Sequence, residues 1–349
     1  MNLKERIQTF VDLGVFLKDF KEGNDNLLSD EFEKLRSKIH ESEVKNNWFT
    51  KDNIEKSLLS ISNQLTQDNI NSWLTPYNLS DIEEKKKVLL VMAGNIPLVG
   101  FHDFLSVVIS GNIAVVKLSS NDNVLFTFLW EVICKINPYF SERLDYIDNI
   151  KERKFDAVIA TGSDNSAKYF EYYFKNIRRI IRKNRRSIAV LNGKESNQEL
   201  QGLADDVFLY FGLGCRSVSK VFLPKGYNLD KLFDVFFPFK EIVNHKKYGN
   251  NYDYNKAIFL MGGHNLTENG FLLMKEDNSL QSPVSMLFYE FYEDLDKVKD
   301  YIDENADLLQ CVVCKEDIVK KNTHFGETQK PQLWDYADNV DTIEFLTTL

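Results

Sequence analysis

The stretch KVLLVMAGNIPLVG, residues 87–100, joins a short apolar run to a turn that contains Gly94, Asn95 and Pro97. A run of this length predicts a buried strand, and the Gly and Pro residues predict the turn that ends it. Similar runs follow, separated by helical stretches. Strands are predicted at 88–92, 113–117, 144–147, 157–160 and 187–191. Strands that alternate with helices predict βαβ units, so we expect an α/β protein with a parallel sheet.

A second series of apolar runs begins after residue 215. Strands are predicted at 218–223, 257–260, 271–275, 284–291 and 308–314, and a helix at 294–306. This half is interpreted as a second α/β domain, with a boundary near residue 211. Residues 1–80 differ, because apolar side chains such as Phe10, Leu13 and Leu17 recur there at helical spacing. They predict a helical N-terminal segment.

The composition limits the class of protein. The chain has 349 residues, 43% of them hydrophobic, which is enough to bury a large core. A net charge of −9 argues against nonspecific binding to nucleic acid, which needs a basic face. The sequence offers no signal peptide and no apolar run long enough to cross a bilayer, so we expect a cytoplasmic protein. Four cysteines give no disulfide framework, which fits a reducing compartment.

Cys215 lies in YFGLGCRSVSKVFLP, residues 210–224, where glycines precede the thiol and a strand-like run follows it. Gly212 and Gly214 keep side chains away from the sulfur, so a substrate carbonyl could approach it. Local backbone N–H groups could then face a developing oxyanion. A cysteine beside glycines is more often a packing residue, and Cys215 alone does not decide between the two.

The order of several short motifs adds information. Along the chain come GNIP at 94–97, VVKLSS at 115–120, ATGS at 160–163, LNGK at 191–194 and finally Gly214 and Cys215. This order and spacing resemble the aldehyde dehydrogenase superfamily. Together with the tail HFGETQKPQLWDYADNVDTIEFL, residues 324–346, they most resemble the LuxC-like acyl-CoA reductases, the fatty-acid reductases of bacterial luminescence systems and their relatives.

The resemblance implies an aldehyde dehydrogenase-like fold with a Rossmann-type cofactor domain and a second, catalytic domain. The expected division is a helical segment at 1–80, an NAD(P)-binding domain at 81–211, a catalytic domain at 212–335 and a tail at 336–349. Members of the superfamily commonly form dimers or tetramers, so a homo-oligomer is expected.

The resemblance also assigns roles to two catalytic residues. Cys215 would be the nucleophile that takes the acyl group as a thioester. Asn95, together with the backbone N–H of Cys215, would stabilise the oxyanion. The alternative reading of Asn95 is that it only shapes a turn before Pro97.

The cofactor residues are carried over in the same way. Lys117 would contact the adenosine ribose, although a lysine can also simply snorkel at a strand end. Relatives that prefer NAD often have a glutamate at the position of Ser120, where it repels a 2′-phosphate. A serine at position 120 leaves room and hydrogen-bonding capacity for that phosphate, which favours NADPH over NADH. The cofactor-binding residues predicted on these grounds are Lys117, Ser119, Ser120, Thr161, Gly162, Ser163 and Gln281.

Two of these assignments have a purely structural alternative or a departure from the family pattern. Ser163 precedes a predicted helix at 165–174, so it could be only an N-cap. Gln281 stands in QSP, residues 281–283, where relatives have a glutamate that binds the nicotinamide ribose, so either Gln281 or Ser282 would have to take that role here.

A further departure concerns LNGK at 191–194. Hydrolytic relatives have a glutamate that activates the deacylating water, and Val190 is aligned with it here. An enzyme without that base would hydrolyse its thioester poorly, which suits an enzyme that receives the acyl group from a thiol donor and reduces it. Acyl-CoA or an acyl carrier protein is therefore the expected donor. His324 and Glu327 remain as distant candidates for the base that activates Cys215.

The basic run between Lys175 and Arg186 is unusual in an acidic chain. Such runs are mostly solvated helix faces. The alternative is a dock for phosphates of NADPH or CoA, or for an acidic carrier protein. Cys311 and Cys314 have metal-ligand spacing, but their apolar setting and the lack of a second pair predict a buried strand and no metal.

Two other functions stay open at this stage. The same fold could reduce an acyl phosphate, with the basic run binding the phosphate. The chain could also be a noncatalytic acyl-binding or scaffold subunit that partners an acyl-protein synthetase or transferase. A thiol at Cys215 that does not react would favour the scaffold.

Overall fold

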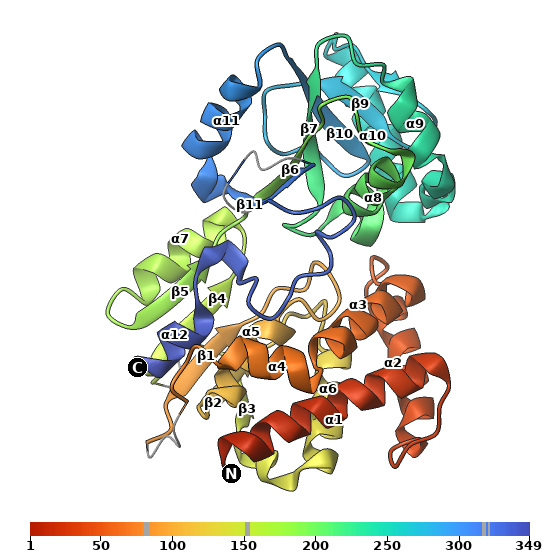
Figure 1. Cartoon of the computed structure of the whole chain (residues 1–349). Coiled ribbons are helices and arrows are strands. Elements are labelled where there is room, and N and C mark those ends of the chain that lie inside the picture. The colour runs from red at the N-terminus through yellow and green to blue at the C-terminus, as the bar shows by residue number, and fades with distance from the viewer. Residues whose placement is uncertain (80–83, 151–153, 316–318, 320–321) are drawn as a thin grey trace. The chain divides into compact units, whose positions relative to one another are not determined.

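The computed structural model describes residues 1–79, 84–150, 154–315, 319 and 322–349. The chain forms two compact units (Figure 1). The first unit consists of Met1–Lys183 and Gln332–Leu349, and the second unit consists of Asn184–Pro331. The domain boundaries predicted at residues 80, 211 and 335 divide the chain by function and stay predictions.

In the part of the chain that the structure describes, four helices precede the first strand, which confirms the predicted helical N-terminal segment. They are α1 (Leu3–Glu22), α2 (Asp30–Lys45), α3 (Lys51–Gln64) and α4 (Gln67–Leu74). Asn2 and Glu5 form a capping box at the start of α1, in which each side chain accepts a hydrogen bond from the other residue's backbone N–H. Phe10 and Leu13 are fully buried, so packing stabilises this helix. Among the described residues, no helix is long and apolar enough to span a membrane.

The first unit contains a five-stranded sheet in which all strands are parallel. Its order is β3 (Leu144–Tyr146), β2 (Ile113–Lys117), β1 (Lys87–Val91), β4 (Ala157–Thr161) and β5 (Arg178–Arg182). The helical elements between the strands are α5 (Phe101–Ile109), α6 (Val124–Ile136), the 3-10 helix η1 (Pro138–Glu142) and α7 (Asp164–Tyr173). This is the predicted Rossmann-type arrangement, and we call it sheet A.

Helices cover both faces of sheet A, and the side chains of β1 show why its strands are continuously apolar. Val88 and Leu90 pack into the core that includes residues of α5 and α6. Leu89, between them, packs on the opposite face with Phe174, the residue that follows α7. Successive side chains of a strand point to opposite faces, so both must be apolar when both faces are covered.

The second unit contains a six-stranded sheet, sheet B. Its order is β11 (Leu309–Cys314), β6 (Arg186–Val190), β7 (Val218–Pro224), β10 (Met286–Tyr292), β9 (Leu273–Glu276) and β8 (Thr267–Glu268). Only the β8 and β9 pair is antiparallel. The helical elements are α8 (Asn197–Phe208), η2 (Leu209–Gly212), α9 (Asp230–Phe236), η3 (Phe237–Asn244), α10 (Lys246–Met261), α11 (Leu295–Glu304) and η4 (Ala306–Leu308). The predicted second α/β half is confirmed.

Two predictions of secondary structure are wrong. The run at 257–260, predicted as a strand, is the last turn of α10. A four-residue apolar run fits one turn of a helix as well as a short strand, and the N-cap at His245, whose Nδ1 accepts from the Tyr248 N–H, makes the helix favourable here. The basic run, for which the sequence favours a solvated helix face, instead has β5, the edge strand of sheet A, at its centre.

The predicted buried strand around Cys311 and Cys314 is confirmed. Both cysteines lie in β11, with exposed fractions of 4% and 0%.

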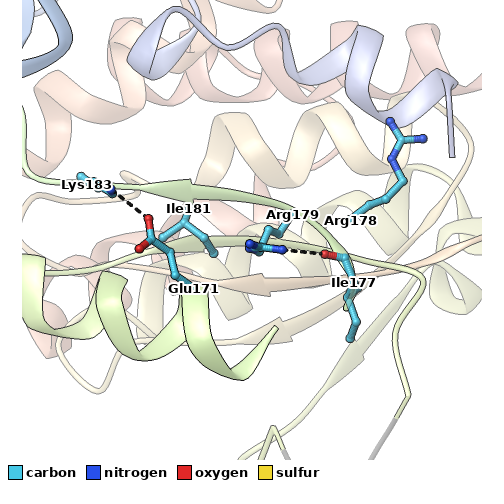
Figure 2. A pocket seen from close by; sticks show the side chains of 6 residues that line it. All are labelled: Glu171, Ile177, Arg178, Arg179, Ile181 and Lys183. Carbon is cyan, nitrogen blue, oxygen red and sulfur yellow. Dashed lines mark hydrogen bonds and ion pairs between the residues drawn. The ribbon is translucent and has the colours of Figure 1, made fainter. Parts of the chain in front are cut away.

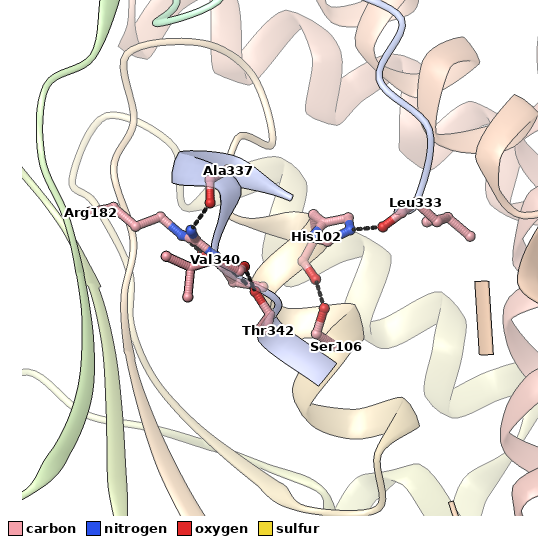
Figure 3. Close-up of polar contacts among 8 residues, drawn as sticks. His102, Ser106, Arg182, Leu333, Ala337, Val340 and Thr342 are labelled. Atoms are coloured by element: carbon pink, nitrogen blue, oxygen red, sulfur yellow. Dashed lines mark hydrogen bonds and ion pairs between the residues drawn. The ribbon is translucent and has the colours of Figure 1, made fainter. Parts of the chain in front are cut away.

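The C-terminal segment packs within the first unit and includes η5 (Ala337–Asn339) and α12 (Thr342–Thr347). Figure 3 shows its polar contacts. His102 Nε2 lies 2.9 Å from the carbonyl oxygen of Leu333, and Arg182 donates to the carbonyl of Ala337 at 2.7 Å. Arg182 also donates to Thr342 Oγ1 at 3.0 Å. These bonds fasten the tail to α5 and β5.

Candidate active site

The predicted cofactor residues of the first unit gather at the carboxyl edge of sheet A. Asn95 follows β1, Lys117 ends β2, and Thr161 ends β4. In the order β3-β2-β1-β4-β5 the chain leaves β1 toward one side and later returns to the other side. The carboxyl ends of β1 and β4 therefore border a topological switch point, where α/β sheets bind ligands.

The loops that follow β1 and β2 lie in direct contact. A Cβ atom built on Gly94 would come within 2.5 Å of Ser119 Oγ and 2.8 Å of Ser119 Cβ. Met92 N–H donates to the carbonyl of Lys117 at 3.1 Å, which extends the pairing beyond the strands. Only glycine permits this approach, and the next residue, Asn95, is exposed.

The loop that carries Asn95 is also anchored beyond it. Ser57 Oγ donates to the carbonyl of Pro97 at 2.8 Å. Leu98 has a φ of 58°, in the left-handed region, and its N–H donates to Asp122 Oδ2 at 2.6 Å. This turn presents Asn95 on a loop fixed at both ends, as an oxyanion donor requires.

Asp122 is a residue of this site that the sequence analysis missed. It is 8% exposed, and its Oδ1 atom has no hydrogen-bond partner among the described residues. Burial raises the pKa of Asp122 to about 7, against the opposing effect of the hydrogen bond from Leu98. The turn sequence Asn121, Asp122 and Asn123 was the available signal for it.

Lys117 and the two serines after it stand at the end of β2. Lys117 is half-buried, Ser119 accepts a hydrogen bond from Asn121 N–H at 3.2 Å, and Ser120 is exposed. The predicted position of Lys117 at the end of a strand is confirmed, whereas its contact with a cofactor stays a prediction.

The turn between β4 and α7 is tight. Ser163 is the N-cap of α7, and its Oγ accepts from the Ser166 N–H at 3.4 Å. A Cβ on Gly162 would lie 2.8 Å from Ser166 Cβ, so this position also requires a glycine. The turn brings the N-terminus of a helix to the switch point, where its N–H groups favour an anion.

These features fit a dinucleotide cofactor. Glycines at 94 and 162 hold the loops where a side chain would collide, a lysine stands at the end of β2, and a helix N-terminus follows β4. Together they provide the charge and the close backbone approach that a bound pyrophosphate needs.

Cys215 belongs to the second unit and lies in a turn between η2 and β7. The Ser217 N–H donates to the carbonyl of Gly214 at 3.0 Å and closes this turn. Ser187 Oγ donates to the carbonyl of Cys215 at 2.9 Å and accepts from the Cys311 N–H at 3.2 Å. The half-buried Cys215 is thus fastened to both β6 and β11.

The residues just before this turn have an unusual backbone. Tyr210, Phe211 and Gly212 have φ values of 53°, 58° and 71°, all in the left-handed region. Each such non-glycine residue costs about 1 to 2 kcal/mol. Both aromatic side chains are buried, and the ring centroid of Phe211 lies 4.3 Å from that of His245, so packing offsets the strain. Strained backbone conformations cluster at functional sites, and this segment directly precedes the turn of Cys215.

Gln281 lies at the same edge of sheet B as Cys215. Cys215 precedes β7 and Gln281 precedes β10, so both stand at the amino ends of parallel strands. Arg186, the first residue of β6, donates to Gln281 Oε1, and Ser219 Oγ donates to the carbonyl of Leu280 at 2.7 Å. The structure therefore brings Gln281 to the cysteine's edge, and its predicted contact with the cofactor ribose stays a prediction.

The interpretation of Val190 is wrong. Val190 is 2% exposed and ends β6, where it pairs with Phe222, whereas Ser187 at the start of β6 holds the Cys215 turn. Three residues of strand span about 10 Å. Val190 therefore lies at the opposite edge of sheet B and cannot occupy the place of a base beside Cys215.

His324 and Glu327, the candidate bases, are both exposed. Their segment is fastened to the second unit by Asp206, which accepts from the N–H groups of Gly326 at 2.7 Å and Thr328 at 3.1 Å. Burial raises the pKa of Asp206 to about 6 despite these bonds. The identity of the base stays a prediction.

The predicted site residues thus form two groups. One lies at the carboxyl edge of sheet A in the first unit, and it comprises Asn95, Lys117, Ser119, Ser120, Thr161, Gly162 and Ser163. The other, of Cys215 and Gln281, lies at the amino edge of sheet B in the second unit. Among the described residues, no cluster of three or more metal-ligating side chains occurs.

The fold resembles that of solved aldehyde dehydrogenases. An acetylating aldehyde dehydrogenase from Geobacillus thermoglucosidasius has 12% identity and a TM-score of 0.63, covering 99% of this chain and 90% of that one. Aldehyde dehydrogenase 21 from Physcomitrella patens, in complex with succinate, has 12% identity and a TM-score of 0.63, covering 91% and 74%. Aldehyde dehydrogenase C from Pseudomonas syringae, in complex with NAD+ and octanal, has 9% identity and a TM-score of 0.63, covering 90% and 72%.

No curated protein matches the chain. The model of the acyl-CoA reductase (LuxC) family, however, matches residues 20–231, which is more than half of the sequence. On this match and the aldehyde dehydrogenase-like fold, the chain belongs to the LuxC acyl-CoA reductase family, whose members are oxidoreductases that act on acyl or aldehyde groups.

Proposed function

We propose that the protein reduces a fatty acyl thioester to a fatty aldehyde with NADPH, through an acyl group held on Cys215. The acyl donor is acyl-CoA or an acyl carrier protein. The observation that carries this proposal is the turn around Cys215, which Ser187 fastens to the strands and which a left-handed backbone precedes.

Cys215 begins the reaction as a thiolate that attacks the carbonyl carbon of the donor thioester. The carbon–sulfur bond to the donor breaks, and the donor thiol leaves with a proton. The carbonyl oxygen carries negative charge in this step, and the Asn95 amide and the Cys215 N–H are the donors that stabilise it.

The second step reduces the thioester on Cys215. A nicotinamide cofactor supplies a hydride when it is bound. The Asn95 amide and the Cys215 N–H would stabilise the second oxyanion, which would form when the thioester carbonyl accepts a hydride, and collapse of this oxyanion would break the bond to sulfur. The aldehyde leaves and Cys215 returns to a thiolate, so one acyl thioester, one NADPH and one proton give one aldehyde, one thiol and NADP+.

The residues at the carboxyl edge of sheet A hold the cofactor in this proposal. Lys117 and the exposed Ser120 bind the adenosine half, and Ser120 accommodates a 2′-phosphate that a glutamate would repel. The helix N-terminus at Ser163 and the glycines at 94 and 162 border the rest of the cofactor. Gln281 binds the nicotinamide ribose in this proposal.

The test is NADPH oxidation with a panel of acyl-CoAs, repeated with NADH. Cys215→Ala is expected to lose activity by a factor of about 1,000 or more, because no other group takes the acyl chain. Cys134→Ala is the matched control, since Cys134 is also a half-buried cysteine, on α6.

NADPH oxidation that requires Cys215 and releases an aldehyde supports the proposed reductase. The rates with the different acyl-CoAs then rank the preferred chain lengths. Full activity of Cys215→Ala contradicts the proposal. An unmodified protein that turns over neither acyl-CoA nor carrier-bound acyl groups contradicts it as well.

A further inference from the structure

Helix α7 and strand β5 present an exposed surface rich in tyrosine and basic residues. Tyr169, Tyr172 and Tyr173 on α7 are 47%, 76% and 38% exposed. Tyr169 and Tyr173 stack with centroids 5.7 Å apart. Lys175 Nζ lies 5.5 Å from the Tyr172 ring centroid, so the basic and aromatic groups adjoin. We call this the Tyr–Arg surface, and it comprises Tyr169, Tyr172, Tyr173, Lys175, Arg178, Arg179 and Lys183.

A hollow of about 510 Å³ lies at this surface, between α7 and β5 (Figure 2). It is lined by Glu171, Ile177, Arg178, Arg179, Ile181 and Lys183. Ile177 and Ile181 contribute apolar side chains, and the arginines and Lys183 contribute positive charge. Lys183 pairs with Glu171 at 2.8 Å. The hollow can therefore receive a side chain with both an apolar part and a negative charge.

The positive charge of the two arginines is not consumed by the hydrogen bonds that orient them. Arg179 donates to the carbonyls of Phe174 and Lys175, and Arg178 donates to the carbonyl and hydroxyl of Thr348. These acceptors are neutral, so the hydrogen bonds orient each guanidinium without neutralising it, and Glu171 is the acidic group that interacts with the charge of Arg179. Residues 165–183 include six basic residues and one acidic residue, in a chain with a net charge of −9.

Protection of the sheet edge explains only part of this composition. Basic side chains on an edge strand such as β5 prevent pairing with another sheet. Three exposed tyrosines on the adjacent helix do nothing for that purpose and leave apolar area in water. Tyrosine and arginine are among the residues enriched at the energetic centres of protein interfaces.

The end of this surface lies near the proposed cofactor site. Thr161 at the end of β4 is in register with Arg182 at the end of β5, so Lys183 stands at the carboxyl edge of sheet A. A partner on the Tyr–Arg surface therefore adjoins the edge that carries Asn95 and Ser163. Nucleic acid is disfavoured, because the rest of the chain is acidic and would repel it.

We propose that the Tyr–Arg surface docks an acidic acyl carrier protein, which delivers the acyl group on its flexible thioester arm. The inference rests on the proposed function and identifies the donor as a protein. Acidic side chains of the carrier protein form ion pairs with the basic residues of the surface, and Tyr172 packs against apolar side chains of the carrier protein. Acyl-CoA, which lacks a protein surface, reaches the active site without this contact.

The test compares two double variants of the full chain. Tyr172→Ala with Lys175→Glu removes a 76% exposed tyrosine and reverses a lysine inside the surface. Tyr139→Ala with Lys4→Glu does the same outside it, where Tyr139 is 77% exposed and Lys4 is exposed. Titration with purified phosphopantetheinylated acyl carrier protein gives the Kd of the parent and of each variant for the carrier protein. The steady-state rate of acyl-CoA reduction is measured for the same proteins.

The surface variant is expected to raise the Kd for the carrier protein about tenfold, while the control variant leaves it unchanged. Both variants are expected to retain the parent's kinetics with acyl-CoA. Absence of binding by the parent, or equal Kd values for the two variants, overturns the proposal. If the Kd values differ but the parent reduces no acyl-CoA, docking holds and the reductase assignment fails.

Discussion

Asp122 connects the two loops that border the proposed oxyanion and cofactor sites. It accepts from the Leu98 N–H in the loop after β1 and itself lies in the loop after β2. A buried carboxylate with a single hydrogen bond is costly when charged. Its pKa of about 7 means that the ionised form destabilises the folded protein at neutral pH.

Stability should therefore depend on pH through Asp122. The carboxyl of an unfolded Asp has a pKa of about 3.9. Because the folded value is about 7, the folded protein binds more protons between these values. The stability contributed by this group is fully present below about pH 4 and is lost as the pH rises through about 7.

Asp122→Asn should remove this titration while its amide oxygen still accepts from Leu98. At about pH 8 we expect the free energy of unfolding of the variant to be at least that of the parent, and up to about 1 to 3 kcal/mol higher. Urea unfolding at about pH 5 and about pH 8 measures the difference. Asp148→Asn, at an exposed carboxyl, is the control. A parallel pH dependence in Asp122→Asn and the parent would show that Asp122 is not the group.

Ser120 determines cofactor preference in the proposed function. Ser120→Glu places a negative charge beside the 2′-phosphate, so kcat/KM with NADPH should fall about tenfold or more relative to NADH. Steady-state kinetics with both cofactors measure the ratio, and Ser141→Glu, at an exposed serine in η1, controls for the added charge. An unchanged ratio would remove Ser120 from the cofactor site.

Helix α8 holds the segment that contains His324 and Glu327 against the second unit. Asp206 accepts from the N–H groups of Gly326 and Thr328, and Gln329 Nε2 donates to Ser217 Oγ at 3.2 Å. The segment therefore contacts the turn that contains Cys215, because Ser217 follows Cys215 by two residues. Close packing of this segment on α8 depends on Gly202.

Gly202→Ala should destabilise the second unit. The added Cβ would lie 2.8 Å from the backbone carbon of Phe325 and 2.9 Å from Gly326 N, and backbone atoms cannot move aside easily. We expect a loss of about 1 to 3 kcal/mol in the free energy of unfolding. Gln201→Ala, at an exposed position of the same helix, should cost little. Equal stability of the two variants, measured by urea unfolding, would contradict this packing.

The sequence predicted some elements well and others poorly, for physical reasons. The strand at 113–117 was predicted with its true bounds, since a run of β-branched residues ends there at Lys117 and two serines. The helix at 257–260 was missed because a four-residue apolar run has no clear period. Strand β5 was missed because its arginines are oriented by carbonyls and by Asp103, partners that only the folded structure reveals.

Arg182 illustrates how such a charge becomes part of the core. It is 4% exposed and pairs with Asp103 at 2.6 Å. Burial alone would raise the pKa of Asp103, but the adjacent guanidinium outweighs it and holds that pKa below its usual value.

For the molecule as a whole, the order of motifs along the chain predicted the family and the two α/β halves. The predicted site residues fall into two groups on two units, one per sheet edge. Ser187, Asp122 and the left-handed Tyr210 and Phe211 were not predicted. Their roles depend on contacts between strands and on backbone angles. The residue type alone, such as a serine or a tyrosine, does not reveal these features in a sequence.

The central claim is that Cys215 carries the acyl group. The most direct measurement is intact-mass and peptide mass spectrometry of the protein after incubation with acyl-CoA in the absence of cofactor. We predict one acyl group, bound at Cys215 as a thioester, which disappears when NADPH is added and is recovered as aldehyde. A protein that acquires no acyl group, or acquires it at Cys134 instead of Cys215, would contradict the account.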